Sequence, residues 1–87
     1  MNAAPTPTLR LSELRRNQTA LVRGVESRGA DDGIAQRLRE LGFVAGEPVK
    51  VVALAPLGAD PLLVQIGFTR FALRRAEARR VVVDATP

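Results

Sequence analysis

The apolar residues of this chain follow a helical period in one place. Ile34, Leu38 and Leu41 fall at positions i, i+4 and i+7 and form a single apolar stripe, whereas the residues between them are mostly polar. This pattern predicts one amphipathic helix at about residues 33–41.

Both ends of this helix carry residues that favour helix boundaries. Asp31 or Asp32 provides a carboxylate that can accept hydrogen bonds from the free backbone amides of the first turn. Gly42 stands where helices commonly end in a left-handed residue, and Phe43 follows where a Schellman ending would fold it back onto Leu38. We therefore expect the helix to begin after the aspartates and to end before Gly42.

Arg37 and Glu40 lie three residues apart on the polar side of the predicted helix. At this spacing an exposed ion pair contributes only ~0.2–0.5 kcal/mol. The pair is expected either to be solvated or to position a neighbouring loop.

Elsewhere the apolar period is two, which is typical of strands. The alternation predicts five strands, at 19–25, 48–54, 62–66, 71–73 and 81–83. A tight turn is expected at 67–70, and the two prolines and the glycine at 55–61 predict a loop because they cannot continue a strand ladder. Short helical turns are expected around Ser12 and Glu13 and at 74–78.

This order of elements indicates a mainly β fold of one domain. An open sheet of five short strands leaves two edges unpaired, so we predict a small antiparallel barrel. The helix follows the first strand and would close one end of the barrel, and a short helical turn precedes the last strand. Residues 1–8 are expected to form a flexible arm, residues 9–84 the domain and residues 85–87 a tail.

The absence of cysteine and histidine narrows the chemistry that the chain can perform. Disulfides and thiolate chemistry are excluded, as are the commonest general base and the commonest metal ligand. The serine and threonine hydroxyls have no imidazole to activate them. We therefore expect a protein without enzyme activity.

The charge of the chain leaves a nucleic-acid partner as an alternative. Thirteen basic and nine acidic residues give a net charge of +4, but the basic residues are scattered and form no polybasic tail. The three aromatic residues are all phenylalanine, whereas single-strand binding relies on exposed aromatic platforms. No specific nucleic acid is expected, and a basic barrel that binds nucleic acid is the alternative interpretation.

No segment has the features of a membrane span or a secretion signal. The longest apolar stretch, 51–59, contains Pro56 and Gly58 and is far shorter than the ~20 residues that a spanning helix needs. The first eight residues have neither a basic start nor an apolar run. We expect a cytoplasmic protein that does not insert into membranes.

Carboxylates and backbone carbonyls are the only groups left that could hold a metal ion. These groups suit hard cations better than a selective transition-metal site, so no cofactor is expected beyond a weakly bound divalent metal. A further alternative is a self-associating regulatory module, such as a homodimer, that shares a divalent ion between copies. The weak candidate ligands are Asp31, Asp32, Glu40, Glu77 and Asp84.

The loop at 56–61 contains an apolar residue in an unusual place. Leu57 lies between Pro56 and Gly58. It either stands exposed at the loop tip, where only a partner would bury it, or folds down over the mouth of the barrel. The sequence favours neither arrangement.

Three segments, in order and at matching intervals, resemble the ferrous iron transport protein A (FeoA) family. The run RLRELGF at 37–43, followed by Gly46 and by Pro48-Val49, resembles the family's RL-x-x-LG signature. The run APLGADPL at 55–62 resembles its APLG-DP segment, and FALRRAEA at 71–78 resembles its segment with a basic pair. The resemblance covers about residues 11–84.

This resemblance implies an SH3-like barrel, in agreement with the strand pattern, similar to the C-terminal domain of iron-dependent repressors. It implies a small cytosolic accessory protein of bacterial ferrous iron uptake. Its partner would be the large membrane transporter, whose cytoplasmic part is a GTP-binding domain. The family is often described as metal-binding.

The loop composition and the resemblance together predict a surface that binds this transporter. Leu57 would be the apolar anchor, and the neighbouring arginines would supply orientation and encounter rate more than affinity. The residues expected to bind the partner are Pro56, Leu57, Gly58, Asp60, Arg74 and Arg75. The residues expected to form the structural motif are Asp32, Leu38, Leu41, Gly42, Phe43 and Gly46.

Overall fold

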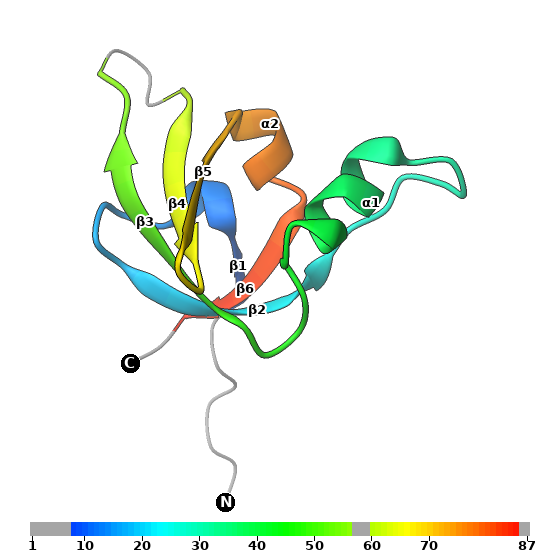
Figure 1. The fold of residues 1–87 in the computed structure, drawn as a ribbon, viewed down its shortest axis with the longest axis horizontal. Helices are drawn as coiled ribbons and strands as arrows, with labels where there is room; N and C mark the ends of the chain where they lie inside the picture. Colours follow the sequence, from blue (N-terminus) through cyan, green and yellow to red (C-terminus); the bar gives the residue numbers. More distant parts are fainter. Residues whose placement is uncertain (1–7, 57–59, 86–87) are drawn as a thin grey trace, which may run out of the picture.

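The last strand of the chain pairs with the first two strands in a single antiparallel sheet. The computed structural model describes residues 8–56 and 60–85. The elements are β1 (Thr8–Arg10), the 3₁₀ turn η1 (Leu11–Glu13), β2 (Thr19–Val25), α1 (Gly33–Glu40), β3 (Pro48–Leu54), β4 (Leu62–Ile66), β5 (Thr69–Leu73), α2 (Arg75–Ala78) and β6 (Val81–Ala85). The strand order is β1-β6-β2-β3-β4-β5, and the sheet curves into a small barrel (Figure 1).

The predicted strands and helix occur in the predicted order, but β5 begins at Thr69, inside the turn predicted at 67–70, and β6 continues beyond 83 to Ala85. β2, β3 and β4 have the predicted bounds, and α1 covers the predicted helix except for Leu41. Along β2 and β3 exposed and buried residues alternate, so one side of each strand faces the core. The mainly β barrel with one inserted helix is therefore confirmed, but the expectation that curling pairs the edge strands is wrong, because β1 and β5 each have a single partner strand in the described residues.

The sheet has one strand more than the sequence predicts. β1 pairs with β6, with Thr8 opposite Asp84 and Leu9 opposite Val83. Thr8, expected in the arm, and Ala85, expected in the tail, both lie in strands. β1 was missed because it has three residues, too few to show a period, and because its partner lies at the other end of the chain.

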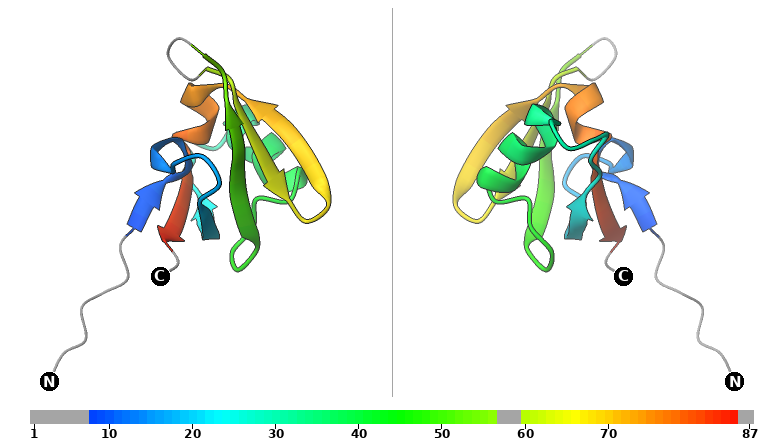
Figure 2. Two further views of the ribbon diagram at one scale, coloured as in Figure 1. Left: turned by 90° about the vertical axis from the view of Figure 1, so that its left-hand side faces the viewer. Right: turned by 90° about the vertical axis from the view of Figure 1, so that its right-hand side faces the viewer.

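Two bulges bend the sheet into its curved shape. The register of β2 with β6 shifts between Val22 and Gly24, and that of β3 with β4 shifts between Val51 and Ala53. A bulge bends its strand and increases the local twist. The strands β4 and β5 therefore turn back over the core, as the two side views in Figure 2 show.

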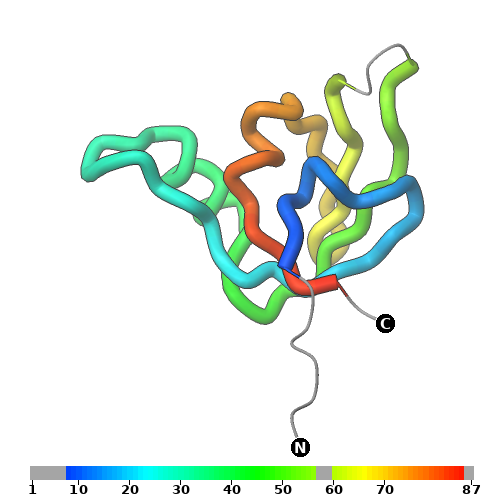
Figure 3. Tube along the Cα trace, turned by 180° about the vertical axis from the view of Figure 1, so that it is seen from behind, coloured from blue at the N-terminus to red at the C-terminus, as the bar shows by residue number. Residues whose placement is uncertain are grey.

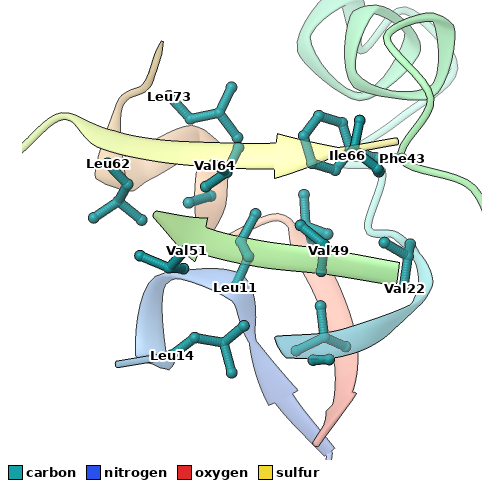
Figure 4. Close-up of a cluster of buried hydrophobic side chains, with 14 of the residues drawn as sticks. Leu11, Leu14, Val22, Phe43, Val49, Val51, Leu62, Val64, Ile66 and Leu73 are labelled. Carbon is teal, nitrogen blue, oxygen red and sulfur yellow. The ribbon is translucent and has the colours of Figure 1, made fainter. Parts of the chain in front are cut away.

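The core is a single cluster of aliphatic side chains around one phenylalanine. Phe43 is the largest fully buried side chain, and its ring centroid lies 6.2 Å from that of Phe71. Figure 4 shows side chains from β2, β3, β4 and the η1 segment meeting inside the sheet. The cluster comprises Leu11, Leu14, Ala20, Val22, Leu38, Phe43, Val49, Val51, Leu62, Val64, Ile66, Leu73, Ala78, Val81 and Val83.

The helix α1 contacts the barrel through a narrower stripe than predicted. Ala35 and Leu38 are fully buried and Leu41 is half-buried, but 42% of Ile34 is exposed. Figure 3 shows that α1 and the loop before it project to one side of the barrel. The prediction that Ile34 helps to close the barrel is therefore wrong: periodicity gives the direction of the stripe but not how far the barrel reaches along the helix.

Both short helical turns begin with the same side-chain contact. In η1, Glu13 Oε1 accepts a hydrogen bond of 2.7 Å from the backbone N–H of Arg10. In α2, Glu77 Oε1 accepts one of 2.9 Å from the backbone N–H of Arg74. Each glutamate is the third residue of its turn and therefore satisfies a free amide before it, as in a capping box.

Asp32, rather than Asp31, caps α1, and it also binds the segment before the helix and the side chain of Arg80. Its Oδ1 accepts from Ala35 N at 3.1 Å, and its Oδ2 accepts from Arg28 N at 2.8 Å and from the guanidinium of Arg80. The side chains of Asp32 and Arg80 are only 7% and 11% exposed. The hydrogen bond from Arg80, followed by the two backbone donors, holds the pKa of Asp32 well below its usual range.

The C-terminus of α1 has the predicted Schellman geometry. Gly42 has φ +113°, the amide of Phe43 donates to Leu38 O at 3.1 Å, and the amide of Gly42 donates to Arg39 O at 3.1 Å. These bonds satisfy carbonyls that would otherwise lack partners. They also turn the chain so that Phe43 enters the core.

Gly46 connects the turn after α1 to the sheet. It has φ +92°, and its amide donates to Val22 O at 2.8 Å. In return, Val22 N donates to Glu47 O at 2.8 Å. The segment between α1 and β3 is therefore tied to the middle of β2.

We predict opposite effects for two glycine substitutions in α1 and its ending. Gly42→Ala should lower the free energy of unfolding by about 1–3 kcal/mol, because a residue with a Cβ is strained at this φ. The added Cβ would meet Ile66 Cγ2 at 3.7 Å, an ordinary contact, so the loss comes from the backbone. Gly33→Ala, in open space in the first helical turn, should raise stability by up to about 1 kcal/mol. Urea unfolding measures both, and a loss at both positions would contradict this account.

We also predict that the contribution of Asp32 to stability depends on pH. Because its pKa is lower in the folded than in the unfolded state, its contribution is complete above the unfolded value of about 3.9 and declines as the pH falls below it. Asp32→Asn should therefore be less stable than the natural chain at pH 7, and the difference should shrink between pH 4 and pH 2. The control is Asp31→Asn, since Asp31 is exposed and makes no ion pair with the described residues. A difference that stays constant down to pH 2 would argue against the ion pair.

Candidate functional site

The loop between β3 and β4 has a fixed base. Ala55 N donates to Pro61 O at 3.2 Å, which closes the loop at its stem. Asp60 Oδ1 accepts a hydrogen bond of 3.0 Å from the backbone N–H of Arg75, the first residue of α2. The predicted contact residues Leu57 and Gly58 lie outside the described residues, whereas Pro56 is exposed at the edge of the stem.

The structure gives different roles to Arg74 and Arg75. The Arg75 guanidinium donates to Ser12 O at 3.1 Å, so this half-buried side chain connects α2 to η1. Arg74 is exposed, and its guanidinium has no ion-pair partner among residues 8–56 and 60–85. Of the two predicted contact arginines, Arg74 is thus the one whose charge is available at the surface.

A surface ion pair connects the two helices. Arg37 Nη2 lies 3.0 Å from Glu77 Oε2, and Arg39 Nη2 donates to Val25 O at 3.1 Å. The predicted pairing of Arg37 with Glu40 is therefore wrong, because Glu77 of α2 lies within reach of the same guanidinium. The pair links α1 to α2 across 40 residues of sequence and so helps to hold α1 in place.

The candidate metal-ligating carboxylates do not form a cluster. Within the described part of the chain no three Asp or Glu side chains are placed to hold a metal ion. Both oxygens of Asp32 accept hydrogen bonds, Glu77 bonds to Arg37 and to a backbone amide, and Asp84 Oδ1 lies 3.6 Å from Arg23 Nη1. Asp31 and Glu40 are exposed. The carboxylates present thus do not fit a metal site within one copy of the chain.

Two exposed apolar side chains were not predicted as functional residues. Phe68 is fully exposed at the tip of the β4–β5 hairpin, and 44% of Val44 is exposed after α1. A shallow pocket beside Val44 is lined by Leu41, Gly42, Val44, Glu47, Ile66 and Gly67. The sequence contains a signal for the exposure of Phe68: this aromatic residue directly follows Gly67 in the predicted tight turn, where its side chain cannot be buried.

No helix in the described ranges is long and apolar enough to cross a membrane. The candidate site is a surface at one end of the barrel, formed by the stem of the β3–β4 loop, the start of α2 and Arg74. It offers a fixed backbone, a proline and one arginine that has no ion-pair partner in the described part of the chain. Such a surface suits contact with another macromolecule.

The comparison with protein families assigns nearly the whole chain to one domain. The FeoA domain matches residues 9–85. A fusion protein of Fe(2+) transport protein A and the Fe(2+) transporter FeoB, from Porphyromonas gingivalis, is 38% identical over 76 residues, which are 87% of this chain. The chain spans only 8% of the length of that fusion protein.

Solved structures agree with this assignment. The FeoA of Stenotrophomonas maltophilia, in complex with zinc and described as an SH3 domain protein, is 60% identical, with a TM-score of 0.81 over 87% of this chain and 89% of its own. A manganese-dependent transcriptional repressor has a TM-score of 0.78 at 19% identity over 95% of this chain and 44% of its own, which shows likeness of fold alone. The barrel is SH3-like, and the chain belongs to the FeoA family, which is associated with ferrous iron transport.

Proposed function

We propose that this chain is a non-enzymatic accessory protein of ferrous iron uptake that binds the cytoplasmic, GTP-binding part of the membrane transporter. The relative in which an A-type segment and the transporter occur in one polypeptide supports this partner. Fusion keeps two domains at high effective concentration, which is useful when they act on each other. Binding to this part of the transporter requires the chain to lie in the cytoplasm.

The observation that carries this proposal is the fixed stem of the β3–β4 loop. Asp60 joins the stem to α2, and Arg75 joins α2 to η1, so the residues of the loop start from a rigid base. A surface fixed before binding loses less conformational freedom when the complex forms. Asp60 and Arg75 therefore act by positioning the surface, and the contact itself falls to Pro56, Leu57 and Arg74.

These contact residues would contribute in different ways. An apolar anchor buried at the centre of an interface accounts for much of the binding free energy, and we assign this role to Leu57. The cation of Arg74 would speed encounter with an acidic surface and orient the complex. We therefore expect Leu57 to affect dissociation and Arg74 to affect association.

The test of the anchor is Leu57→Asp. We expect it to weaken binding to the isolated cytoplasmic domain of the transporter by about thirtyfold or more, as for other anchor residues. The control is Leu21→Asp: 41% of Leu21 is exposed, and it pairs with Pro48 at the opposite end of β3 from the loop. Surface plasmon resonance measures both. Unchanged affinity of the Leu57 variant would remove the loop from the interface.

The test of the cation is Arg74→Glu. At low ionic strength we expect the association rate to fall about tenfold, with a smaller effect in high salt. Arg16→Glu is the matched control, since Arg16 is exposed and lies in the loop before β2. Equal effects of both substitutions would indicate only a general effect of net charge.

The two alternative functions, nucleic-acid binding and metal-dependent self-association, predict different binding and sedimentation results for the purified chain. A nucleic-acid binder would lose affinity for an oligonucleotide steeply as salt is raised. A metal-dependent module is favoured by the zinc present in the Stenotrophomonas maltophilia structure, and it would change mass in sedimentation experiments on addition of zinc. We expect weak, unspecific retention of nucleic acid and an unchanged mass.

A further inference from the structure

The strand β5 is an open edge of the sheet. It is the last strand in the order β1-β6-β2-β3-β4-β5, and in the described part of the chain it pairs only with β4. Figure 2 shows β5 at the outer margin of the barrel in both views. β1, the other edge, has only three residues, whereas β5 has five.

The register of the hairpin determines which backbone groups of β5 point outward. Gly67, with φ +59°, and Phe68 form a two-residue turn, so Ile66 and Thr69 are the hydrogen-bonded pair that closes it. Hydrogen bonding to β4 then recurs at every second residue. The N–H and C=O groups of Arg70 and Ala72 therefore point away from β4, toward the open edge.

Nothing among the described residues occupies these four backbone groups. Arg70 and Ala72 are both exposed, and neither makes a backbone hydrogen bond to a turn or loop in residues 8–56 and 60–85. Natural edge strands are commonly blocked by proline, by a bulge or by a covering element. β5 contains no proline, and its register with β4 is regular over all five residues.

The charges beside this edge indicate the kind of strand that would fit. On the outer face Lys50, Gln65 and Arg70 stand opposite one another on β3, β4 and β5, and Arg70 Nε donates to Gln65 Oε1 at 3.1 Å. Neither Lys50 nor Arg70 forms an ion pair with a described residue. The next position of this row, on an added strand, would therefore favour a carboxylate.

The other face of β5 favours an apolar side chain. Phe71 is half-buried, and its ring packs near that of Phe43. A residue opposite Phe71 on an added strand would cover its exposed part, as cross-strand aromatic pairs do in sheets. Successive residues of the added strand would thus alternate between acidic and apolar.

We propose that β5 binds an extended segment of an acidic partner protein by strand addition, with acidic residues opposite Arg70 and Ala72 and an apolar residue opposite Phe71. A second copy of this chain fits less well, because antiparallel pairing of two β5 strands would bring the cations of two Arg70 residues together. A nucleic acid also fits less well, since backbone N–H and C=O groups in strand register match a peptide. The proposal does not depend on the β3–β4 loop or on which protein supplies the segment.

The test uses a nine-residue peptide with blocked termini in which glutamate and valine alternate. Titrated into the isotopically labelled chain, it should shift the amide resonances of Arg70 and Ala72 and slow their hydrogen exchange. A peptide of lysine and valine should bind at least tenfold more weakly, and Arg70→Glu should reverse this preference. Shifts only at other residues, or none with millimolar peptide, would overturn the proposal.

Two further probes separate strand addition from simple charge attraction. In an antiparallel addition, the backbone N–H groups of the glutamates opposite Arg70 and Ala72 donate hydrogen bonds to β5. N-methylation of these glutamates removes the donors and should therefore abolish binding. Ala72→Pro removes an outward donor at an edge position that tolerates proline and should weaken binding about tenfold, whereas Ala72→Val keeps the donor and should not. Equal binding of the methylated peptide would overturn the proposal. So would stronger shifts at β5 with a single-stranded oligonucleotide, or self-association of the chain through β5.

Discussion

β6 pairs with both β1 and β2 and so determines where the N-terminal strand, α1 and α2 meet. It joins the two ends of the domain and places the segment just before β6 at a meeting point. There Arg79 O accepts from the Arg10 guanidinium at 3.4 Å, Arg80 O accepts from Glu26 N at 2.8 Å, and the Arg80 side chain pairs with Asp32. Without β6 in this position, α1 would lose the partner of its N-cap.

Polar contacts as well as buried side chains attach α1 to the rest of the domain. α1 buries Ala35 and Leu38, and its attachments also include the ion pairs from Asp32 to Arg80 and from Arg37 to Glu77 and the hydrogen bond from Arg39 to Val25 O. An isolated surface ion pair contributes little, but a nearly buried one strongly restricts geometry. The same helix α2 that receives Arg37 also holds the β3–β4 loop through the amide of Arg75. The candidate docking surface and α1 are thus positioned by one short helix.

The sequence predicted the features that depend on neighbouring residues. The cap by an aspartate, the Schellman ending at Gly42 and the bounds of β2, β3 and β4 all follow from local patterns. It did not predict contacts between distant segments. Arg80 is 48 residues from Asp32, and Glu77 is 40 residues from Arg37. The sequence alone does not show which of several acidic residues each arginine contacts.

The candidate site was predicted only in part, because some of its contacts also join segments that are distant in the sequence. The loop and the arginine pair were found from composition and from the resemblance to FeoA proteins, but the sequence treats Arg74 and Arg75 as equivalent. The start of α2 separates them: Arg75 reaches back to Ser12, and Arg74 stays at the surface. The open edge of β5 has no sequence signal, because a strand becomes an edge only through the order of strands in the sheet.

We propose that this protein acts by contact with the cytoplasmic domain of the ferrous iron transporter, through the end of the barrel formed by the β3–β4 stem and α2. Hydrogen–deuterium exchange of the chain, measured with and without that domain, locates the contact surface. Slower exchange should appear in the stem of the β3–β4 loop and in α2 and leave β1 unchanged. An exchange pattern that is the same in every segment with and without a saturating amount of the domain would contradict the account.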